Sequence, residues 1–113
     1  MKVTLLSRTK QGKVLKRVQG LGYRVQVEPP ERIRSLDAAS CDQVYLVPLK
    51  ETTGDGTWPQ TRVHLARASR YYVVFGSSLG SREVMAAARD GAFDVLDGND
   101  DDERWVEALQ NAA

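Results

Sequence analysis

The chain has 113 residues and is poor in the residue types that build disulfides and metal cages. Its single cysteine, Cys41, excludes an internal disulfide and any site made of several cysteines. Its single histidine, His64, argues against a zinc site or a catalytic triad. No apolar run approaches the roughly 18 residues that a membrane-spanning helix needs, and no signal-peptide pattern follows Met1. We therefore expect a cytoplasmic protein that contacts no membrane.

A strong excess of one charge is also missing. Lys and Arg number 16 and Asp and Glu number 15, so the net charge of +1 removes the simplest argument for nucleic-acid contact. The charges are unevenly placed, because residues 1–50 carry ten basic and four acidic side chains whereas residues 51–113 carry six and eleven. This asymmetry either orients a partner or a second copy of the chain, or is the chance unevenness of a small domain.

Short apolar runs alternate with helical periods along the chain, which is long enough for one hydrophobic core and too short for two. These runs predict strands at 2–6, 23–28, 43–47, 71–75 and 93–96. Helices are predicted after the first strand, from Pro30, and at 58–68, 81–89 and 102–111, with a loop at 48–56. Five β–α units in succession indicate a parallel sheet with helices on both faces and a crevice at the carboxyl ends of the strands.

The apolar positions of the helices predict which side of each one faces the sheet. In chain order, the expected inner residues are Val14, Leu15, Val18 and Leu21; Ile33 and Leu36; Val63 and Ala66; Val84, Met85 and Ala88; and Trp105 and Leu109. The acidic run at 97–103 is interpreted as a solvated loop and helix cap. It is not a calcium loop, because the glycine and the bidentate glutamate of such a loop would fall on Asp102 and Ala108.

The segment Arg89-Asp90-Gly91-Ala92-Phe93-Asp94-Val95-Leu96 closely fits an element, x-x-G-A-x-D-Y-L, of receiver domains of the CheY-like, response-regulator type. Asp42–Val47 is similar to the third strand of that family, and Lys2–Thr9 is similar to its first. The chain thus resembles a receiver domain over nearly all of its length. The resemblance implies an α/β fold of the flavodoxin or CheY-like type, a three-layer α/β/α sandwich around a five-stranded parallel sheet in the order 2-1-3-4-5.

The residues that a receiver needs for phosphorylation are replaced in this chain. A working receiver has two metal-binding acids after its first strand, a phospho-accepting aspartate ending the third, and a Thr or Ser after the fourth. It also has a switch aromatic in its fifth strand and a Lys-Pro pair after it. In the same order, this chain has Ser7 and Arg8, Val47, Gly76 with Ser77 beside it, Val95, and Gly98-Asn99.

Aspartyl phosphorylation needs a carboxylate nucleophile and a divalent cation held by oxygen ligands. Val47 offers no nucleophile, and the fixed positive charge of Arg8 opposes a metal ion. The resemblance and these losses together predict a pseudo-receiver with no metal, no cofactor and no enzymatic activity. The vacated crevice then has two fates. It accepts a small anionic metabolite beside Arg8, or it collapses around an internal pair of Arg8 with Glu51 or Asp55.

The leading functional hypothesis is a regulatory module that acts by protein–protein contact without a phosphorylation switch. In the receiver family, the fourth helix, fifth strand and fifth helix carry dimer or effector contacts. The matching residues here are Val84, Ala88, Val95 and Ala108, flanked by Arg89 and Asp94. The expected partners are a second copy of the chain, forming a homodimer, or an attached output domain.

Residues 1–113 are expected to be a single domain, the amino-terminal piece of a longer regulator. NtrC-type, sigma-54-dependent transcription activators have this layout, because they join a receiver to an ATPase and a DNA-binding domain. The receiver part itself is then expected to touch no nucleic acid. The alternative hypothesis is a sensor that binds a small ligand in the vacated crevice.

Overall fold

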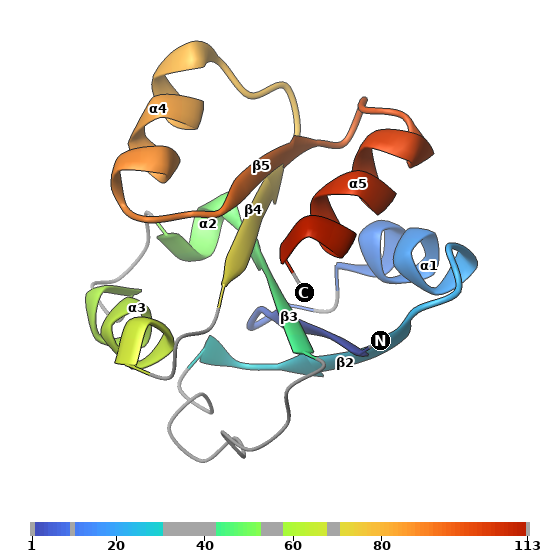
Figure 1. The fold of residues 1–113 in the computed structure, drawn as a ribbon, viewed down its shortest axis with the longest axis horizontal. Coiled ribbons are helices and arrows are strands. Elements are labelled where there is room, and N and C mark those ends of the chain that lie inside the picture. Colours follow the sequence, from blue (N-terminus) through green and yellow to red (C-terminus); the bar gives the residue numbers. More distant parts are fainter. Residues whose placement is uncertain (1, 10, 31–42, 53–57, 68–70, 113) are drawn as a thin grey trace.

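The computed structural model describes residues 2–9, 11–30, 43–52, 58–67 and 71–112 (Figure 1). Strands and helices alternate along these ranges except between β2 and β3, which are separated by residues outside the described ranges, and a short additional helix, α2, follows the third strand. In chain order they are β1 (Lys2–Leu6), α1 (Gly12–Gly20), β2 (Arg24–Glu28), β3 (Gln43–Pro48), α2 (Leu49–Thr52), α3 (Trp58–Arg67), β4 (Tyr72–Gly76), α4 (Ser81–Arg89), β5 (Asp94–Asp97) and α5 (Asp102–Ala112). Within the described ranges, no helix is long and apolar enough to cross a bilayer.

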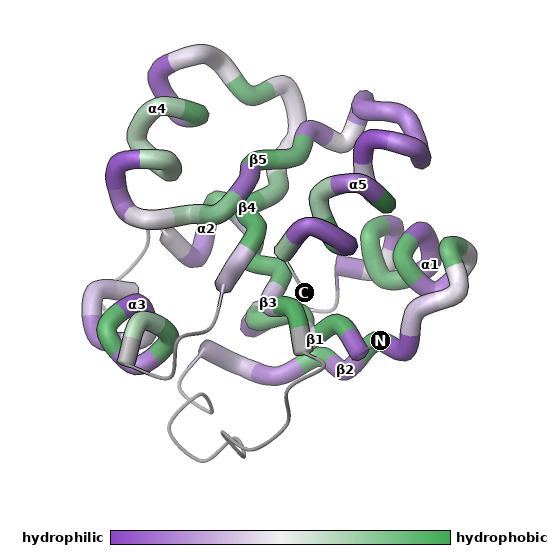
Figure 2. Tube along the Cα trace, viewed as in Figure 1, coloured by the Kyte–Doolittle hydropathy of each residue, from purple (hydrophilic) through white to green (hydrophobic). Residues whose placement is uncertain are grey.

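The strands form one parallel sheet in the order β2-β1-β3-β4-β5. The predicted fold class and strand order are therefore confirmed. The central strands are built from branched and aromatic apolar residues, which suit a pleated surface covered on both faces. Figure 2 shows these hydrophobic strands in the middle of the molecule, between helices that carry hydrophilic stretches. Because all strands run the same way, their carboxyl ends meet at one edge of the sheet.

Side chains alternate between the two faces of the sheet, so each face has its own core. The core that includes α1 and α5 consists of Val3, Leu5, Val18, Val44, Leu46, Val73, Phe75, Leu96, Trp105, Ala108, Leu109 and Ala112. The core that includes α3 and α4 consists of Leu6, Tyr45, Val47, Trp58, Leu65, Tyr72, Val74 and Ala87. Figure 1 shows α1 and α5 on one side of the sheet and α3 and α4 on the other, which makes three layers.

The first and last helices face the sheet as predicted. Val18 of α1 and both Trp105 and Leu109 of α5 are fully buried. The start of α5 is fixed by Asp101, whose carboxylate accepts the backbone N–H of Arg104 at 2.9 Å. Such a side-chain cap replaces one of the hydrogen bonds that the first turn of a helix lacks.

The predicted inner face of α3 is wrong. The buried residues are Trp58, Thr61 and Leu65, whereas Val63 is 44% exposed and Ala66 is also exposed. The buried residues are spaced i, i+3 and i+7, as a packed helical face requires. Polar Thr61 interrupts their stripe in the sequence, and the pattern therefore favoured the wrong side.

The predicted inner face of α4 is wrong as well. Ala87 is the buried residue of this helix, whereas Val84, Met85 and Ala88 are exposed. Residues 84–88 are all apolar, so the sequence has no period there that selects one face.

The predicted loop at 48–56 begins instead with the end of β3 and the short helix α2. The hydroxyl of Thr52 donates to the carbonyl of Leu49 at 2.7 Å and closes that single turn. The helix predicted from Pro30, with Ile33 and Leu36, lies outside the described residues apart from Pro30 itself.

Candidate functional site

Three of the predicted pocket residues, Gly76, Ser77 and Gly98, meet at the carboxyl edge of the sheet. Gly76 lies beside Asp97 in the register of β4 and β5. The backbone N–H of Gly98 then donates to the carbonyl of Gly76 at 2.8 Å. The ends of β4 and β5 are thereby held together at the position that the resemblance assigned to the phosphorylation pocket.

Val47, at the predicted acceptor position, is fully buried. It lies beside Val74 in the register of β3 and β4, and both belong to the core that also holds Leu6. The side chain therefore serves as core packing. It offers neither a nucleophile nor a surface that a phosphodonor could reach.

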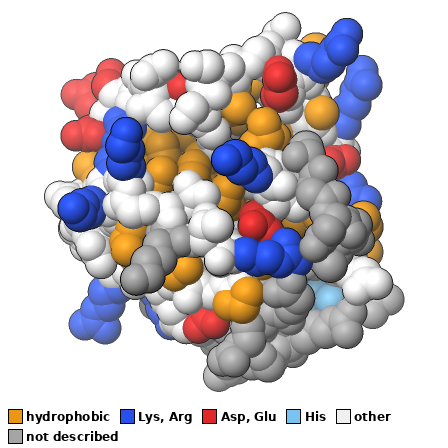
Figure 3. Space-filling view, turned by 180° about the vertical axis from the view of Figure 1, so that it is seen from behind, with side chains coloured by type: hydrophobic (Ala, Val, Ile, Leu, Met, Phe, Trp, Pro, Cys, Tyr) orange, Lys and Arg blue, Asp and Glu red, His pale blue; other side chains and the backbone are white. Residues whose placement is uncertain are grey.

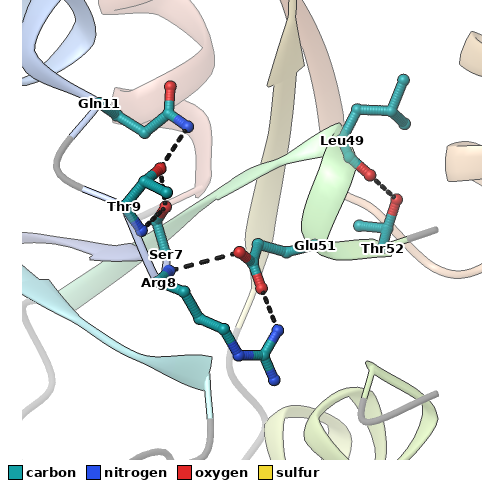
Figure 4. Close-up of polar contacts among 7 residues, drawn as sticks. All are labelled: Ser7, Arg8, Thr9, Gln11, Leu49, Glu51 and Thr52. Atoms are coloured by element: carbon teal, nitrogen blue, oxygen red, sulfur yellow. Dashed lines mark hydrogen bonds and ion pairs between the residues drawn. The ribbon is translucent and has the colours of Figure 1, made fainter. Parts of the chain in front are cut away.

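Arg8, at a predicted metal position, is paired with Glu51 of α2 (Figure 4). One guanidinium nitrogen, Nη1, donates to Glu51 Oε2 at 2.8 Å, and the backbone N–H of Arg8 donates to Oε1 at 3.3 Å. The Glu51 side chain is only 11% exposed and that of Arg8 is 35% exposed. The expected internal pair of Arg8 is present with Glu51 as the partner, and Asp55 lies outside the described residues.

Ser7, at the other predicted metal position, is buried, and both its backbone N–H and its hydroxyl form hydrogen bonds within the chain. Its backbone N–H donates to the carbonyl of Glu28 at 2.9 Å. Its hydroxyl oxygen accepts the backbone N–H of Thr9 at 3.1 Å and lies 3.2 Å from the Thr9 hydroxyl. Gln11 in turn donates to the Thr9 hydroxyl at 3.0 Å (Figure 4). Among the described residues, no group of three or more metal-ligating side chains is found.

Asp97, which the sequence analysis placed in a loop, ties two loops together. One oxygen of its carboxylate accepts the backbone N–H of Leu79, in the loop after β4, and the other accepts that of Asn99, in the loop after β5, both at 2.9 Å. These hydrogen bonds to the charged form, first that of Asn99 and then that of Leu79, lower the pKa of Asp97. The signal available in the sequence is an aspartate at a strand end followed by Gly-Asn, a turn composition.

Arg17 of α1 holds the loop after β5 from the other side. Its guanidinium donates to the carbonyls of Gly98, at 2.9 Å, and of Asp100. It also pairs with Asp102 at 3.1 Å and lies 4.7 Å above the ring of Trp105. The sequence gives no signal for this role, because Arg17 is one of several basic residues on one helix face and its partners lie more than 80 residues away.

A cleft of about 400 Å³ remains open at this edge of the sheet. Gly76, Ser77 and Gly98 are among the residues that line it, together with residues from α1 and α2. Ser7, Arg8 and Val47 do not line it. The predicted pocket is therefore divided: the part at β1 is filled by the Arg8–Glu51 pair, and the part between β4 and α1 is open.

Some of the residues predicted for a contact surface are exposed, and others are not. Val84 of α4 is 38% exposed, and Ala88 and Arg89 of the same helix are exposed. Asp94 of β5 is half-buried and accepts two hydrogen bonds from the guanidinium of Arg104, at 2.6 and 2.9 Å. This bond pair is the main reason that the pKa of Asp94 is lowered.

Ala108, the last of the predicted surface residues, is not at the surface. It is fully buried against the sheet, together with Trp105, Leu109 and Ala112. These four residues are spaced i, i+3, i+4 and i+7 and form the inner face of α5. Val95 is half-buried and packs against the core on the other face.

No family model and no curated protein matches this sequence, but solved structures do. A response regulator CheY-like protein from Mesorhizobium loti is 19% identical with a TM-score of 0.66, and the match covers 99% of this chain and 98% of that one. FixJ-N is 16% identical with a TM-score of 0.72, covering 98% and 91%. The chain has the fold of a CheY-like receiver domain.

A third similar structure is the receiver domain of NtrC4, solved as a beryllofluoride-activated dimer. It is 14% identical with a TM-score of 0.69, and the match covers 98% of this chain and 94% of that one. At such identities the likeness concerns the architecture. What the receiver fold does in this chain is therefore inferred from its residues.

Proposed function

We propose that this chain is a cytoplasmic signal-transduction domain of the receiver type whose state is not set by phosphorylation, and that it acts by contact with other protein surfaces. The main support for the proposal is the Arg8–Glu51 pair. Arg8 stands at a position where the resemblance expects a metal-binding acid, and its guanidinium lies 2.8 Å from the Glu51 carboxylate. Val47, buried at the acceptor position, agrees with it.

The electrostatics of this pair oppose a catalytic metal ion. A divalent cation about 4 Å from the Arg8 guanidinium would be repelled by roughly 8 kcal/mol at an effective dielectric constant of about 20. The attraction of Glu51 at a similar distance would only cancel that repulsion. The described residues contain no group of three or more metal-ligating side chains, so the lost hydration of the ion would be replaced only in part.

The two loops above the pocket are joined to neighbouring segments by hydrogen bonds within the chain. The Asp97 carboxylate holds Leu79, and Gly98 is bonded to Gly76. A surface built on such loops needs no phosphoryl group to order it. This supports contacts that are made constitutively.

The contact surface we propose combines the outer faces of α4 and α5. On α4 the exposed residues Arg82, Met85, Ala86 and Arg89 follow the spacing of one helical face, which is basic and apolar. On α5 the same spacing gives Glu103, Val106, Glu107 and Gln110, a face that is acidic and apolar. A two-fold axis that brings α4 of one copy against α5 of the other pairs these charges twice, so a second copy is the occupant we propose.

The domain is further proposed to be one part of a longer regulator, with an output domain such as that of an NtrC-type transcription activator. In that setting, the dimer formed by α4 and α5 would set the spacing of the attached domains. The activity of the assembly then depends on whether the dimer forms.

Sedimentation velocity across a concentration series tests the proposed contact. We expect the wild type to dimerise, with no change on adding acetyl phosphate and Mg²⁺. Ala86→Glu, in the middle of the proposed α4 face, is expected to be monomeric, because burying an unpaired charge at an interface costs several kcal/mol and weakens a micromolar dimer more than tenfold. The matched control is Ala66→Glu, the same change at an exposed position of α3, outside the proposed surface.

Any of three results would overturn the proposal. Association that appears only with acetyl phosphate and Mg²⁺ would restore a phosphorylation switch. A wild type that is monomeric at all concentrations would show that this surface does not bind a second copy, and so would an Ala66→Glu variant that dissociates as Ala86→Glu does. Circular dichroism of each variant establishes that it is folded.

A further inference from the structure

The cleft at the carboxyl edge of the sheet has an apolar floor. It is contributed by Val14 of α1, Pro48 and Leu49 at the junction of β3 and α2, Phe75 of β4, and Leu79 in the following loop. Figure 3, which views the molecule from behind, shows hydrophobic side chains gathered in the middle of that face with Lys or Arg side chains beside them. A volume of about 400 Å³ lies within the range of clefts that hold small organic molecules.

The polar residues around this floor are basic or neutral. Lys13 reaches the cleft from α1 and Lys50 from α2, and Ser77 adds a hydroxyl. None of the described residues that line the cleft is acidic. Glu51, which follows Lys50, is held by Arg8 outside the lining. The two charged side chains that line the cleft are both basic, which favours an anion.

We propose that this cleft binds a small organic anion with an apolar body, such as an aromatic or branched-chain carboxylate or phosphate. The apolar body would lie on the Val14, Leu49 and Phe75 floor, and the anionic group between Lys13 and Lys50. Neither the two lysines nor the apolar floor suffices alone. Exposed lysine–anion contacts are weak in water, and the floor does not distinguish anions from neutral molecules. The proposed ligand differs from a metal-bound phosphoryl group, which the Arg8–Glu51 pair excludes.

Two glycines keep the cleft open. A Cβ added at Gly76 would lie 2.7 Å from Cδ2 of Leu79, so a side chain there would press on the floor. A Cβ added at Gly98 would lie 3.6 Å from the Ser77 hydroxyl oxygen, at the mouth of the cleft. The small residues at these two positions, which a receiver fills with a hydroxyl side chain and a lysine, therefore leave room for a ligand.

Titration with phenyl phosphate, followed by amide NMR, tests this site. We expect saturable shifts at Gly76, Ser77 and Gly98 with half-saturation at about 1 mM. Inorganic phosphate and benzyl alcohol, which each carry one half of the probe, are expected to bind at least tenfold more weakly. The reversals Lys13→Glu and Lys50→Glu are each expected to weaken phenyl phosphate about tenfold, because each replaces an attraction by a repulsion.

Lys16→Glu is the matched control, since Lys16 is exposed on the same helix as Lys13 and does not line the cleft. It is expected to change the affinity less than about twofold. The proposal is overturned if phenyl phosphate causes no shifts at the amides of Gly76, Ser77 and Gly98. It is also overturned if Lys16→Glu weakens binding as much as Lys13→Glu, or if inorganic phosphate binds as well as phenyl phosphate. The cleft lies apart from the α4 and α5 faces, so ligand binding and dimerisation can fail independently.

Discussion

Replacing Arg17 by alanine removes four contacts that join α1 to the loop after β5 and to the start of α5. The guanidinium donates to the carbonyls of Gly98 and Asp100, pairs with Asp102 and covers the ring of Trp105 at 4.7 Å. The Arg17 side chain is 24% exposed, whereas most of the loop that it contacts is exposed.

The expected cost is about 2–3 kcal/mol in the free energy of unfolding. Each hydrogen bond from the charged guanidinium to a carbonyl contributes roughly 1 kcal/mol once water replaces part of it at this exposed loop. The contact with the Trp105 ring adds about 0.5–1 kcal/mol. The pair with Asp102 adds little, because the Asp102 side chain is 69% exposed. For a domain of this size, the melting temperature is expected to fall by roughly 10 °C.

Urea unfolding of the wild type and Arg17→Ala, followed by tryptophan fluorescence and circular dichroism, measures this cost. Hydrogen exchange provides a local readout, because the amide of Asn99 is expected to exchange faster when its loop is released. Arg24→Ala, at an exposed position of β2, is the control and is expected to cost less than about 0.5 kcal/mol. A loss below about 0.5 kcal/mol for Arg17→Ala would refute the assignment of Arg17 as the residue that orders this loop.

Three further substitutions test other parts of the account. Arg104 lowers the pKa of Asp94 below its unfolded value of 3.8, so the stability that Asp94 contributes is present above that value and lost as the pH falls through the folded pKa. Asp94→Asn is therefore expected to cost about 1 kcal/mol in urea unfolding at pH 7 and almost nothing near pH 2; an equal cost at both pH values would contradict this. Thr4→Val is expected to stabilise the protein by about 1 kcal/mol, because the buried Thr4 hydroxyl has no partner among the described residues; destabilisation would mean that the hydroxyl is bonded. Gly91→Ala is expected to cost at least about 1 kcal/mol because Gly91 has a φ of 102°, and an unchanged melting temperature would exclude backbone strain there.

The strands and their order could be predicted because the sheet is buried on both faces. Runs such as Val44–Val47 and Tyr72–Phe75 are apolar throughout, because a strand that is buried on both faces has apolar residues at every position. The inner face of α5 was also readable, because Trp105 and Leu109 are large and four residues apart. The same spacing predicts that Ala108 is buried, whereas the family resemblance placed it at the surface.

The parts that could not be predicted depend on packing between distant segments. The faces of α3 and α4 were missed because Thr61 is polar and residues 84–88 are uniformly apolar. The Arg8–Glu51 pair was foreseen as one of two pairings, since both charges follow neighbouring strand ends. The contacts of Arg17 and the open cleft beside Lys13 were not foreseen, because they depend on how α1 lies against loops more than 30 residues away.

Intact-mass measurement after incubation with acetyl phosphate and Mg²⁺ tests the central claim, that this receiver fold is not switched by phosphorylation, most directly. With Val47 buried at the acceptor position and Arg8 paired with Glu51 at the metal position, we predict no species heavier by about 80 Da, the mass of one phosphoryl group. A working receiver domain treated in parallel is expected to gain that mass. A stable adduct of about 80 Da on this chain, formed only in the presence of Mg²⁺, would contradict the account.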